Sequence, residues 1–292
     1  MSSPSSPDAS RIAIVTVSYG SDVVLESFLD SVAGASSEPV TTVIADNKAG
    51  DAGNVRDLAA RAGVGYIPVA GNPGYGSAVN RAVASLDRSV EWVLVTNPDV
   101  VLGSGSIDTL LQTAESDITI GSVGPRVFSA EGEVYPSARA VPSLRTGVGH
   151  ALFVNLWTDN PWTRAYRRDA EEIDTRRDAG WLSGACLLVR RSAFEELGGF
   201  DDGYFMYFED VDLGYRLGKA GYRNVYEPAS VVTHTGAHST TADSERMIRT
   251  HHESARRFLG KKYAGVLLWP IRAALRVGLW VRSTLIVRSL RK

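Results

Sequence analysis

Short apolar stretches alternate with segments of helical spacing along the first third of the chain. The stretch 11–19 is rich in Ile and Val and ends at a Gly-Ser turn signal, which is typical of a buried strand. The same pattern predicts strands at 41–45, 65–69 and 91–96, with helices at 23–32, 55–62 and 77–86. This alternation predicts an α/β fold with a mainly parallel, Rossmann-like sheet flanked by helices.

The second half of the chain has a less regular pattern. Pro-containing loops predict a short hairpin within 126–145, and 147–178 is a Trp- and Arg-rich connection without a clear element. The remaining predictions are a strand at 181–190, a short helix at 192–197 and a helix at 209–220 that ends at Gly221. We expect one large domain with a tail, because 292 residues of which 44% are hydrophobic can bury a sizeable core.

The cysteine content and the first residues bear on the compartment. Cys186 is the only cysteine, so no internal disulfide can form and a reducing compartment is expected. Residues 1–10 are rich in Ser and Pro and have neither a basic start nor an apolar stretch, which predicts a disordered leader and not a signal peptide. Together these features predict a cytoplasmic protein.

The charges are unevenly distributed along the chain. Residues 254–292 hold ten of the 31 Lys and Arg residues and no acid, so the rest of the chain has 21 basic against 33 acidic side chains. Such asymmetry predicts a docking surface for an anionic partner. Within 263–290, arginines interrupt every apolar run before it could span a bilayer. We therefore predict a basic amphipathic helical tail on the anionic inner face of the membrane, the alternative being a helix packed on the body.

Polar residues follow the predicted strands, at the sheet edge where open parallel sheets bind ligands. After the first to the fourth strand these are Ser18 and Tyr19, Asp46 and Asn47, residues 71–76, and Asn97-Pro98-Asp99. The last sequence is either a plain turn or the position of a hard oxygen ligand, Asp99, for Mg²⁺ or Mn²⁺. His234 ends the strand-like run 229–233 and would reach the same edge, where an imidazole beside a carboxylate suits a divalent transition ion.

The segment 71–76 (GNPGYG) differs from the dinucleotide-binding fingerprint in its glycine spacing, in containing Pro73 and in following the third strand. A dehydrogenase is therefore not expected. Glycines before a helix let backbone N–H groups approach a phosphate or a sugar, and the alternative is a tight turn.

Three acids, Glu209, Asp210 and Asp212, begin the helix predicted at 209–220, beside an aromatic cluster. The helix dipole stabilises acids in a first turn, which is one explanation for them. Three neighbouring carboxylates are nevertheless costly unless one acts as a base or a metal partner, so one of them is predicted to be catalytic.

Two stretches resemble glycosyltransferase family 2. WLSGACLLVRRSAFEELGGFD and YFMYFEDVDLGYRLGKAG, within 181–221, are similar to the acceptor-side signature of that family. Asn72, Gly74, Tyr75, Gly76 and Asn80 also resemble its donor loop. The resemblance extends over about 12–239 and implies a GT-A fold and a reaction that inverts the anomeric centre.

The resemblance also implies roles for individual residues. Asp210 matches the catalytic base, with Glu209 and Asp212 as supporting acids. Asp99 matches the last acid of the Asp-x-Asp metal element, whose first acid is replaced here by Asn97, so His234 becomes more important for the metal. The implied donor site is Val17, Ser18, Tyr19, Asp46 (which would read the pyrimidine base), Asn47, Asn72, Gly74, Tyr75, Gly76, Asn80, Asn97 and Asp99. The implied acceptor site is Arg139, Trp181, Gly184, His238 and Ser239, of which the last two would close on the diphosphate.

Within the family, the segments VYPSARAVPS, NPWTRAYR and GWLSGACLLVRR and the basic tail look most like rhamnosyltransferases of bacterial cell-wall linker synthesis. This implies dTDP-L-rhamnose as donor and N-acetylglucosaminyl diphosphoryl polyprenol as acceptor. The implied division is a donor-binding half at 11–125, an acceptor-binding and catalytic half at 126–260, and a membrane-associating tail at 261–292. No nucleic-acid partner is expected, and oligomerisation stays open.

Other functions are compatible with parts of this pattern. A family 2 enzyme for a different nucleotide sugar or glycan acceptor would have the same motifs. A sugar nucleotidyltransferase also uses a parallel sheet and a metal-binding Asp, but it normally has a Gly-rich loop with Arg and Lys after its first strand, where this chain has Ser18-Tyr19-Gly20-Ser21. A non-catalytic nucleotide-sugar binding module would explain the loops but not the acidic cluster.

Overall fold

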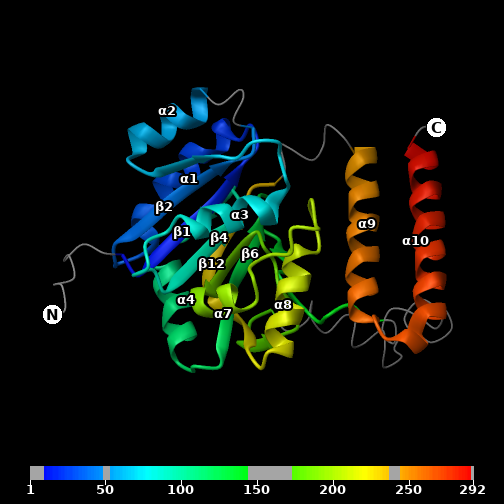
Figure 1. Cartoon of the computed structure of the whole chain (residues 1–292). Coiled ribbons are helices and arrows are strands. Elements are labelled where there is room, and N and C mark those ends of the chain that lie inside the picture. Colours follow the sequence, from blue (N-terminus) through cyan, green and yellow to red (C-terminus); the bar gives the residue numbers. More distant parts are fainter. Residues whose placement is uncertain (1–9, 49–52, 144–172, 237–243, 291–292) are drawn as a thin grey trace.

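The computed structural model describes residues 10–48, 53–143, 173–236 and 244–290. In this part of the chain, ten strands form one sheet with the central order β3-β2-β1-β4-β11-β6-β12-β5 (Figure 1). Its strands are β1 (Ile12–Ser18), β2 (Val40–Asp46), β3 (Gly65–Pro68), β4 (Trp92–Thr96), β5 (Val100–Leu102), β6 (Ile120–Ser129), β7 (Val134–Tyr135), β9 (Arg177–Ala179), β11 (Cys186–Arg190) and β12 (Arg223–His234).

The sheet is mainly parallel, as predicted. Strand β1 lies between β2 and β4 and is parallel to both, β2 is parallel to β3, and β6 is parallel to β12. Strand β11 runs antiparallel between β4 and β6, so the two parallel parts of the sheet meet at an antiparallel strand from the second half of the chain. The amino-acid pattern of a buried strand does not reveal its direction.

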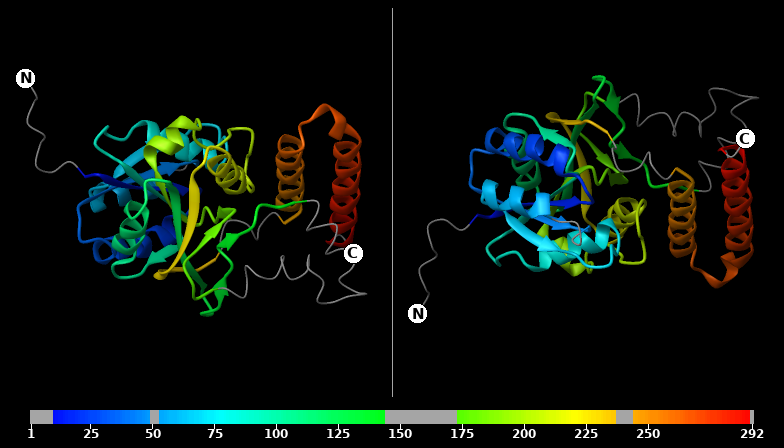
Figure 2. Two further views of the ribbon diagram at one scale, coloured as in Figure 1. Left: turned by 90° about the horizontal axis from the view of Figure 1, so that it is seen from below. Right: turned by 90° about the horizontal axis from the view of Figure 1, so that it is seen from above.

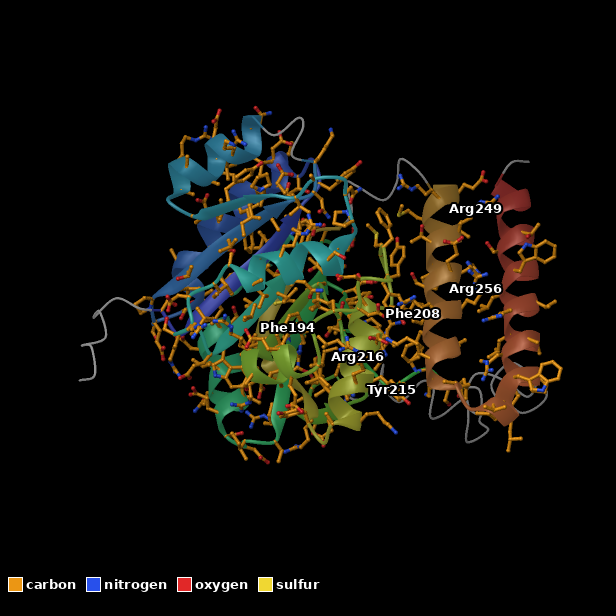
Figure 3. The ribbon with its side chains drawn as sticks, in the orientation of Figure 1. Phe194, Phe208, Tyr215, Arg216, Arg249 and Arg256 are labelled. Atoms are coloured by element: carbon orange, nitrogen blue, oxygen red, sulfur yellow. The ribbon has the colours of Figure 1, made fainter. Side chains whose placement is uncertain are left out.

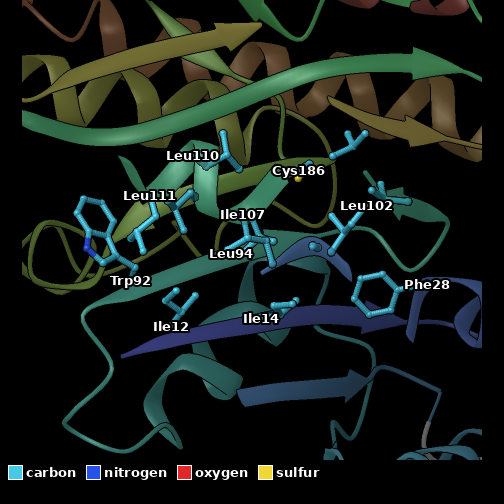
Figure 4. Close-up of a cluster of buried hydrophobic side chains, with 14 of the residues drawn as sticks. Ile12, Ile14, Phe28, Trp92, Leu94, Leu102, Ile107, Leu110, Leu111 and Cys186 are labelled. Atoms are coloured by element: carbon cyan, nitrogen blue, oxygen red, sulfur yellow. The ribbon is translucent and has the colours of Figure 1, made fainter. Parts of the chain in front are cut away.

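Helices cover both faces of the sheet in a three-layer arrangement. They are α1 (Asp22–Ala35), α2 (Gly53–Ala62), α3 (Tyr75–Ala84), α4 (Ser106–Glu115), α7 (Arg191–Glu196) and α8 (Glu209–Lys219). Side chains alternate between the faces of β1: Ile12 and Ile14 belong to the core with α1, α2 and α4, whereas Ala13 and Val15 belong to the core with α3, α7 and α8. Figure 4 shows the first of these two cores.

The strand predicted at 181–190 is wrong in one respect, because it is interrupted at Ser183–Ala185. Its first part, β10 (Trp181–Leu182), pairs with β8 (Ala138–Arg139) in a separate two-stranded sheet. The interruption has a local cause: the Gly184 amide donates to the side chain of Asp210 and not to a neighbouring strand.

Two helices after residue 243 lie beside the body. Helix α9 (Ser244–Lys262) lies between the body and α10 (Trp269–Leu290), and the short 3₁₀ helix η3 (Val266–Leu268) joins them (Figures 1 and 2). Phe258 of α9 is fully buried and packs with Tyr204 and Val211 of the body. None of the helices in the described part of the chain has the combination of length and apolarity needed to cross a bilayer.

Candidate active site

The carboxyl ends of β1, β2 and β4 place the predicted donor-binding residues at one edge of the sheet. In the parallel register Ser18 is the partner of Asp46, and Thr16 is the partner of Thr96, the residue before Asn97. The backbone amide of Asn47 donates to the Ser18 carbonyl oxygen at 2.8 Å. Val17 is buried and Tyr19 is 47% exposed.

Asp46 and Asn47 are both buried at this edge. Asp46 accepts hydrogen bonds from the Tyr66 hydroxyl at 3.0 Å and from the Lys48 amide at 3.0 Å. The side-chain nitrogen of Asn47 donates to the Gly74 carbonyl oxygen at 3.1 Å, while its buried Oδ1 atom has no partner among the described residues. An unpaired buried acceptor is costly, so this oxygen is available for a ligand donor group.

The loop before α3 crosses the same edge in close contact with 204–208. Gly74 has φ +107°, and a Cβ at this position would lie 2.3 Å from the Phe205 carbonyl oxygen, so only glycine fits. Gly76 is similarly restricted, because a Cβ there would lie 2.8 Å from the Cβ atom of Phe200. The Tyr75 amide donates to the Phe205 carbonyl oxygen, and the Tyr75 hydroxyl donates to the Gly184 carbonyl oxygen at 3.0 Å.

Two other residues predicted for the donor site are Asn72, before α3, and Asn80, within α3. Asn80 binds the Phe200 backbone through both its amide nitrogen and its oxygen, and also contacts Asp202 at 3.0 Å. Asn72 has φ +44°, in the left-handed region that Asn tolerates better than most residues. Asn80 therefore fixes the loop that precedes the acidic helix, while Asn72 has a left-handed backbone before α3.

Asp99 and His234 meet where β5 pairs with β12. His234 is opposite Val100 in this antiparallel register, and its Nε2 atom lies 3.1 Å from Oδ1 of Asp99 and 3.3 Å from the Asn97 amide nitrogen. The side chains of Asp99 and His234 are 12% and 25% exposed. The Asp99 carbonyl oxygen also accepts from the Thr235 amide at 2.9 Å, which holds the two segments together.

The first turn of α8 begins after a strained backbone. Tyr207 and Phe208 have φ +68° and +67°, a conformation that is rare for aromatic residues. Phe208, which is labelled in Figure 3, is held by ring contacts with Phe258 and His251 of α9. Strain of this kind persists where the surrounding packing fixes it, and it is often found at functional sites.

Glu209 and Asp210 follow these two residues. Oδ2 of Asp210 accepts a hydrogen bond from the Gly184 amide at 3.0 Å, and Glu209 is buried with no partner for its Oε2 atom in the described structure. Burial and the charge of Asp210 raise the pKa of Glu209 to about 8. Burial also raises the pKa of Asp210, which the hydrogen bond from Gly184 partly offsets.

The link 183–185 connects this acidic pair to the Asn97–Asp99 turn. The Gly184 amide donates to Asp210, and the carbonyl oxygen of the next residue, Ala185, accepts from the Asn97 amide at 2.9 Å. Consecutive Cα atoms are about 3.8 Å apart, so one short piece of backbone holds both groups in place. The carboxylates of Glu209, Asp210 and Asp99 all raise the pKa of the buried Tyr75 hydroxyl, after the larger effect of burial.

Arg139 and Trp181 lie beside the acidic pair on the two-stranded sheet. They are register partners, and the Arg139 guanidinium lies 5.7 Å from the Trp181 ring centroid. The charge of Arg139 lowers the pKa of Asp210, against the effect of burial. Gly184 lies beside the acidic pair as well, because its amide donates to Asp210. His238 and Ser239 lie outside the described residues.

A family profile described as "Glycosyltransferase like family 2" matches residues 7–252. The chain belongs to glycosyltransferase family 2. The N-acetylglucosaminyl-diphospho-decaprenol L-rhamnosyltransferase of Mycobacterium tuberculosis is 45% identical over 95% of this chain and 93% of its own length. Rhamnosyltransferase WbbL of Escherichia coli is 30% identical over 86% of this chain and 93% of its own length.

Solved structures support the fold of this family 2 glycosyltransferase. A mannosyltransferase from Pyrobaculum calidifontis, in complex with GDP-Man and Mn²⁺, has a TM-score of 0.59 at 16% identity, covering 93% of this chain and 71% of its own. GalNAc-T7 with UDP, GalNAc and Mn²⁺ has a TM-score of 0.55 at 13% identity, covering 79% and 45%. The α/β fold is therefore of the GT-A type.

The side chains at the Asp99 turn fit the divalent metal that this fold implies. Asp99 offers a carboxylate oxygen and His234 an imidazole nitrogen from two different strands, and Mn²⁺ and Mg²⁺ accept oxygen ligands while transition ions also accept imidazole. Among the described residues, no three acidic, His or Cys side chains form a metal-binding group. A metal held here would need further ligands, and substrate phosphates commonly supply them.

Asp212 of the glycosyltransferase points to a different region from Glu209 and Asp210. Asp212 is 1% exposed. It forms ion pairs with Arg216 at 2.6 Å, a residue labelled in Figure 3, and with Lys261 of α9. The Tyr204 hydroxyl also lies 3.4 Å from it. These contacts connect α8 to α9.

Sequence reasoning did not find two features of this site. Tyr66, whose hydroxyl binds Asp46, lies on β3 opposite Ile44, and an aromatic residue in a predicted strand carries no sign of such a role. The left-handed Tyr207 and Phe208 also lacked a signal, because neither residue type favours that conformation.

Proposed function

We propose that this glycosyltransferase transfers L-rhamnose from dTDP-L-rhamnose to N-acetylglucosaminyl diphosphoryl polyprenol, in synthesis of a cell-wall linker. The proposal rests on 45% identity over 287 residues to the decaprenol-linked rhamnosyltransferase of M. tuberculosis, and on the similarity to a second rhamnosyltransferase from E. coli. The alignment covers 95% of the chain, so it includes both the donor-binding edge and the acidic helix.

The observation that carries the mechanism is the pair of backbone hydrogen bonds at Gly184 and Ala185, which hold Asp210 and the Asn97–Asp99 turn a short distance apart. In a single displacement the acceptor hydroxyl attacks the anomeric carbon from the face opposite the diphosphate. Asp210 takes the proton from that hydroxyl as general base. Its raised pKa makes the carboxylate a stronger base than an ordinary aspartate.

Asp99 and His234 would hold Mn²⁺ or Mg²⁺ at the opposite side of the reacting sugar. When bound, the metal supplies positive charge that stabilises the leaving diphosphate. Asp46 and Asn47 bind the nucleoside base with polar atoms at the buried edge, and the Gly74–Gly76 backbone borders the sugar and phosphates. Arg139 and Trp181 contribute to the acceptor side, next to Asp210.

A lipid-linked acceptor requires the enzyme to work at the inner face of the cell membrane. The outer helices expose large apolar side chains that a soluble surface would normally bury, and their exposed fractions are Val266 83%, Leu267 92%, Trp269 64%, Val277 61% and Trp280 68%. Exposed tryptophans beside arginines are typical of helices that lie in a membrane interface. We propose that η3 and α10 are this interface.

The donor and acceptor are tested together by incubating the full chain with Mn²⁺, a short-chain N-acetylglucosaminyl diphosphoryl lipid and a panel of nucleotide sugars. We expect product with dTDP-L-rhamnose and at least about tenfold less with the other donors, because a missing hydrogen bond to a sugar hydroxyl is costly in a polar site. Equal turnover with UDP- or GDP-sugars would contradict the proposed donor, while leaving the family assignment unchanged.

Membrane docking is tested by removing 264–292, which keeps Lys261 and its ion pairs. Turnover with a water-soluble acceptor should be within about twofold of that of the full chain. Turnover with acceptor in vesicles should fall at least about tenfold, since the apolar area that the membrane would bury is lost. If the shortened protein still sediments with anionic vesicles, α10 is not the membrane contact.

A further inference from the structure

A basic groove is lined by residues of α9 and α10. These two helices lie side by side next to the body (Figures 1 and 2). The groove is open to solvent and has a volume of about 490 Å³. Its charged lining consists of Glu253, Arg256, Arg257 and Lys261 of α9 with Arg272 and Arg276 of α10. Five cations against one acid make this groove a candidate site for an anion.

The cations of the groove differ in how far other groups neutralise them. Arg257 and Lys261 both pair with Asp201 at 2.8 Å, so they hold α9 on the body. Arg272 donates to the neutral carbonyl oxygens of Tyr263 and Gly265 at 2.8 and 2.7 Å. Within the described part of the chain Arg256 and Arg276 have no ion pair. Arg256, Arg272 and Arg276 therefore leave a positive charge in the groove that Glu253 only partly offsets.

On α10 the arginines of the groove and the exposed tryptophans lie on the same side of the helix. Arg272 and Arg276 line the groove, and Trp269 and Trp280 are mostly exposed. Trp269 and Trp280 are eleven residues apart, about three turns, so they lie on one side of the helix. Arg276 is one turn before Trp280, so the groove opens beside the exposed tryptophans.

We propose that this groove binds the phosphate of an anionic phospholipid headgroup. If the tryptophans lie at the membrane interface, the neighbouring arginines lie at the level of the lipid phosphates, which they bind through charge-assisted hydrogen bonds. The lining of the groove contains none of the residues proposed for the acceptor side, Arg139, Trp181 and Gly184, which favours a lipid of the surrounding membrane over the sugar acceptor. The inference rests on the proposed membrane docking but not on the identity of the donor or acceptor.

The chain offers a matched control for this groove. Arg249 precedes Arg256 by seven residues on the same face of α9, but its guanidinium pairs with Glu245 at 2.8 Å (Figure 3). Arg249→Gln and Arg256→Gln therefore remove the same charge from the same helix, outside and inside the groove. Arg276→Gln tests the opposite wall.

The experiment is calorimetric titration of the full chain with water-soluble dihexanoyl phosphatidylglycerol, and with dihexanoyl phosphatidylcholine and inorganic phosphate as comparisons. We expect saturable binding of the phosphatidylglycerol lipid at one molecule per chain. Arg256→Gln and Arg276→Gln should each weaken it about tenfold, and Arg249→Gln less than about twofold, because hydrogen bonds to charged groups contribute more than neutral ones. Turnover with a water-soluble acceptor should not change.

Three results would overturn the proposal. Equal losses in Arg249→Gln and Arg256→Gln would mean diffuse electrostatic attraction without a discrete site. Inorganic phosphate that binds as tightly as the lipid would make it a free-phosphate site. A loss of turnover towards water-soluble diphosphate acceptor in Arg256→Gln would assign the groove to the acceptor itself. None of these results depends on whether rhamnose is the transferred sugar.

Discussion

Two groups of acids near α8 differ in their partners. Asp210 accepts a hydrogen bond from the Gly184 amide, whereas Oε2 of Glu209 has no partner among the described residues. Burial raises the pKa of both acids. Asp201 and Asp212 are surrounded by Arg216, Arg257 and Lys261. The hydrogen bonds from Arg257 and Lys261 hold the pKa of Asp201 well below its usual value, against the effect of burial.

The difference shows that position in the first turn of a helix does not decide what an acid does. Asp210 and Asp212 are two residues apart, and the helix turns about 200° between them, so they point to opposite sides. One side faces Gly184 and the Asn97–Asp99 turn, and the other faces α9. A carboxylate without a cation stays available for chemistry, while a paired one stabilises the assembly of the two helices.

The largest effect is expected for Asp210→Asn. This change keeps the size and much of the hydrogen bonding but removes the basic oxygen, so turnover should fall by about 10² to 10⁴ while donor affinity is retained. Turnover at saturating donor and acceptor should be measured beside donor binding. More than about a tenth of the original turnover, combined with an inactive Glu209→Gln or Asp212→Asn, would mean that another acid is the base, since about 10² is the lower bound for such a group.

Asp212→Asn should affect stability instead of chemistry. The change leaves Arg216 and Lys261 without their buried partner, so the free energy of unfolding should fall by about 3 kcal/mol. Turnover per folded molecule should stay within a few-fold of the unchanged enzyme. Chemical denaturation and active-site-normalised turnover measure the two parts, and an unchanged unfolding midpoint with lost turnover would remove the distinction between the two groups of acids.

Asp99→Ala extends the comparison to a third acid, which has His234 as its partner. Removing this carboxylate should abolish the part of donor affinity that Mn²⁺ adds, since Asp99 would supply the carboxylate that holds the metal. His234→Ala should act in the same direction but more weakly. Donor titrations with and without Mn²⁺ test this, and a metal-dependent affinity that survives in Asp99→Ala would exclude the proposed metal site.

The smallest effect is a change in the pH dependence of stability on replacing Glu209 by Gln. In the unfolded chain Glu209 ionises above its ordinary pKa of 4.5, whereas in the folded protein it stays protonated up to about 8. The folded state therefore binds more protons in this range, and its stability falls as the pH rises. Glu209→Gln should remove this loss. Relative to the unchanged protein, its free energy of unfolding should therefore be higher at pH 8 than at pH 5 by about 1–3 kcal/mol. Parallel unfolding curves for both proteins across this range would contradict it.

The first third of the fold was predictable because apolar stretches and helical spacing alternate there with little interruption. The sequence also predicted candidate acids at strand ends and at a helix start, and the structure has them at these positions. It could not show that β11 is antiparallel, because a strand buried on both faces has no directional pattern. No element was predicted for α4 or α9, although Phe258 of α9 lies in the core.

The different partners of the three acids could be predicted from the sequence only in part. The cations that neutralise Asp212 come from one turn later, Arg216, and from a separate helix, Lys261. Arg216 lies four residues after Asp212, a local spacing that favours an ion pair on a helix. Lys261 belongs by composition to the basic tail, so its contact with Asp212 depends on how α9 packs and leaves no mark in local spacing.

The most direct test of the account is the stereochemistry of transfer. Loss of turnover in Asp210→Asn cannot by itself distinguish a general base from a nucleophile that forms a covalent sugar intermediate. Nuclear magnetic resonance of the product should separate them. If Asp210 deprotonates the acceptor in a single displacement, the new glycosidic bond will have the anomeric configuration opposite to that of the nucleotide sugar. Retention of the donor configuration would contradict this mechanism.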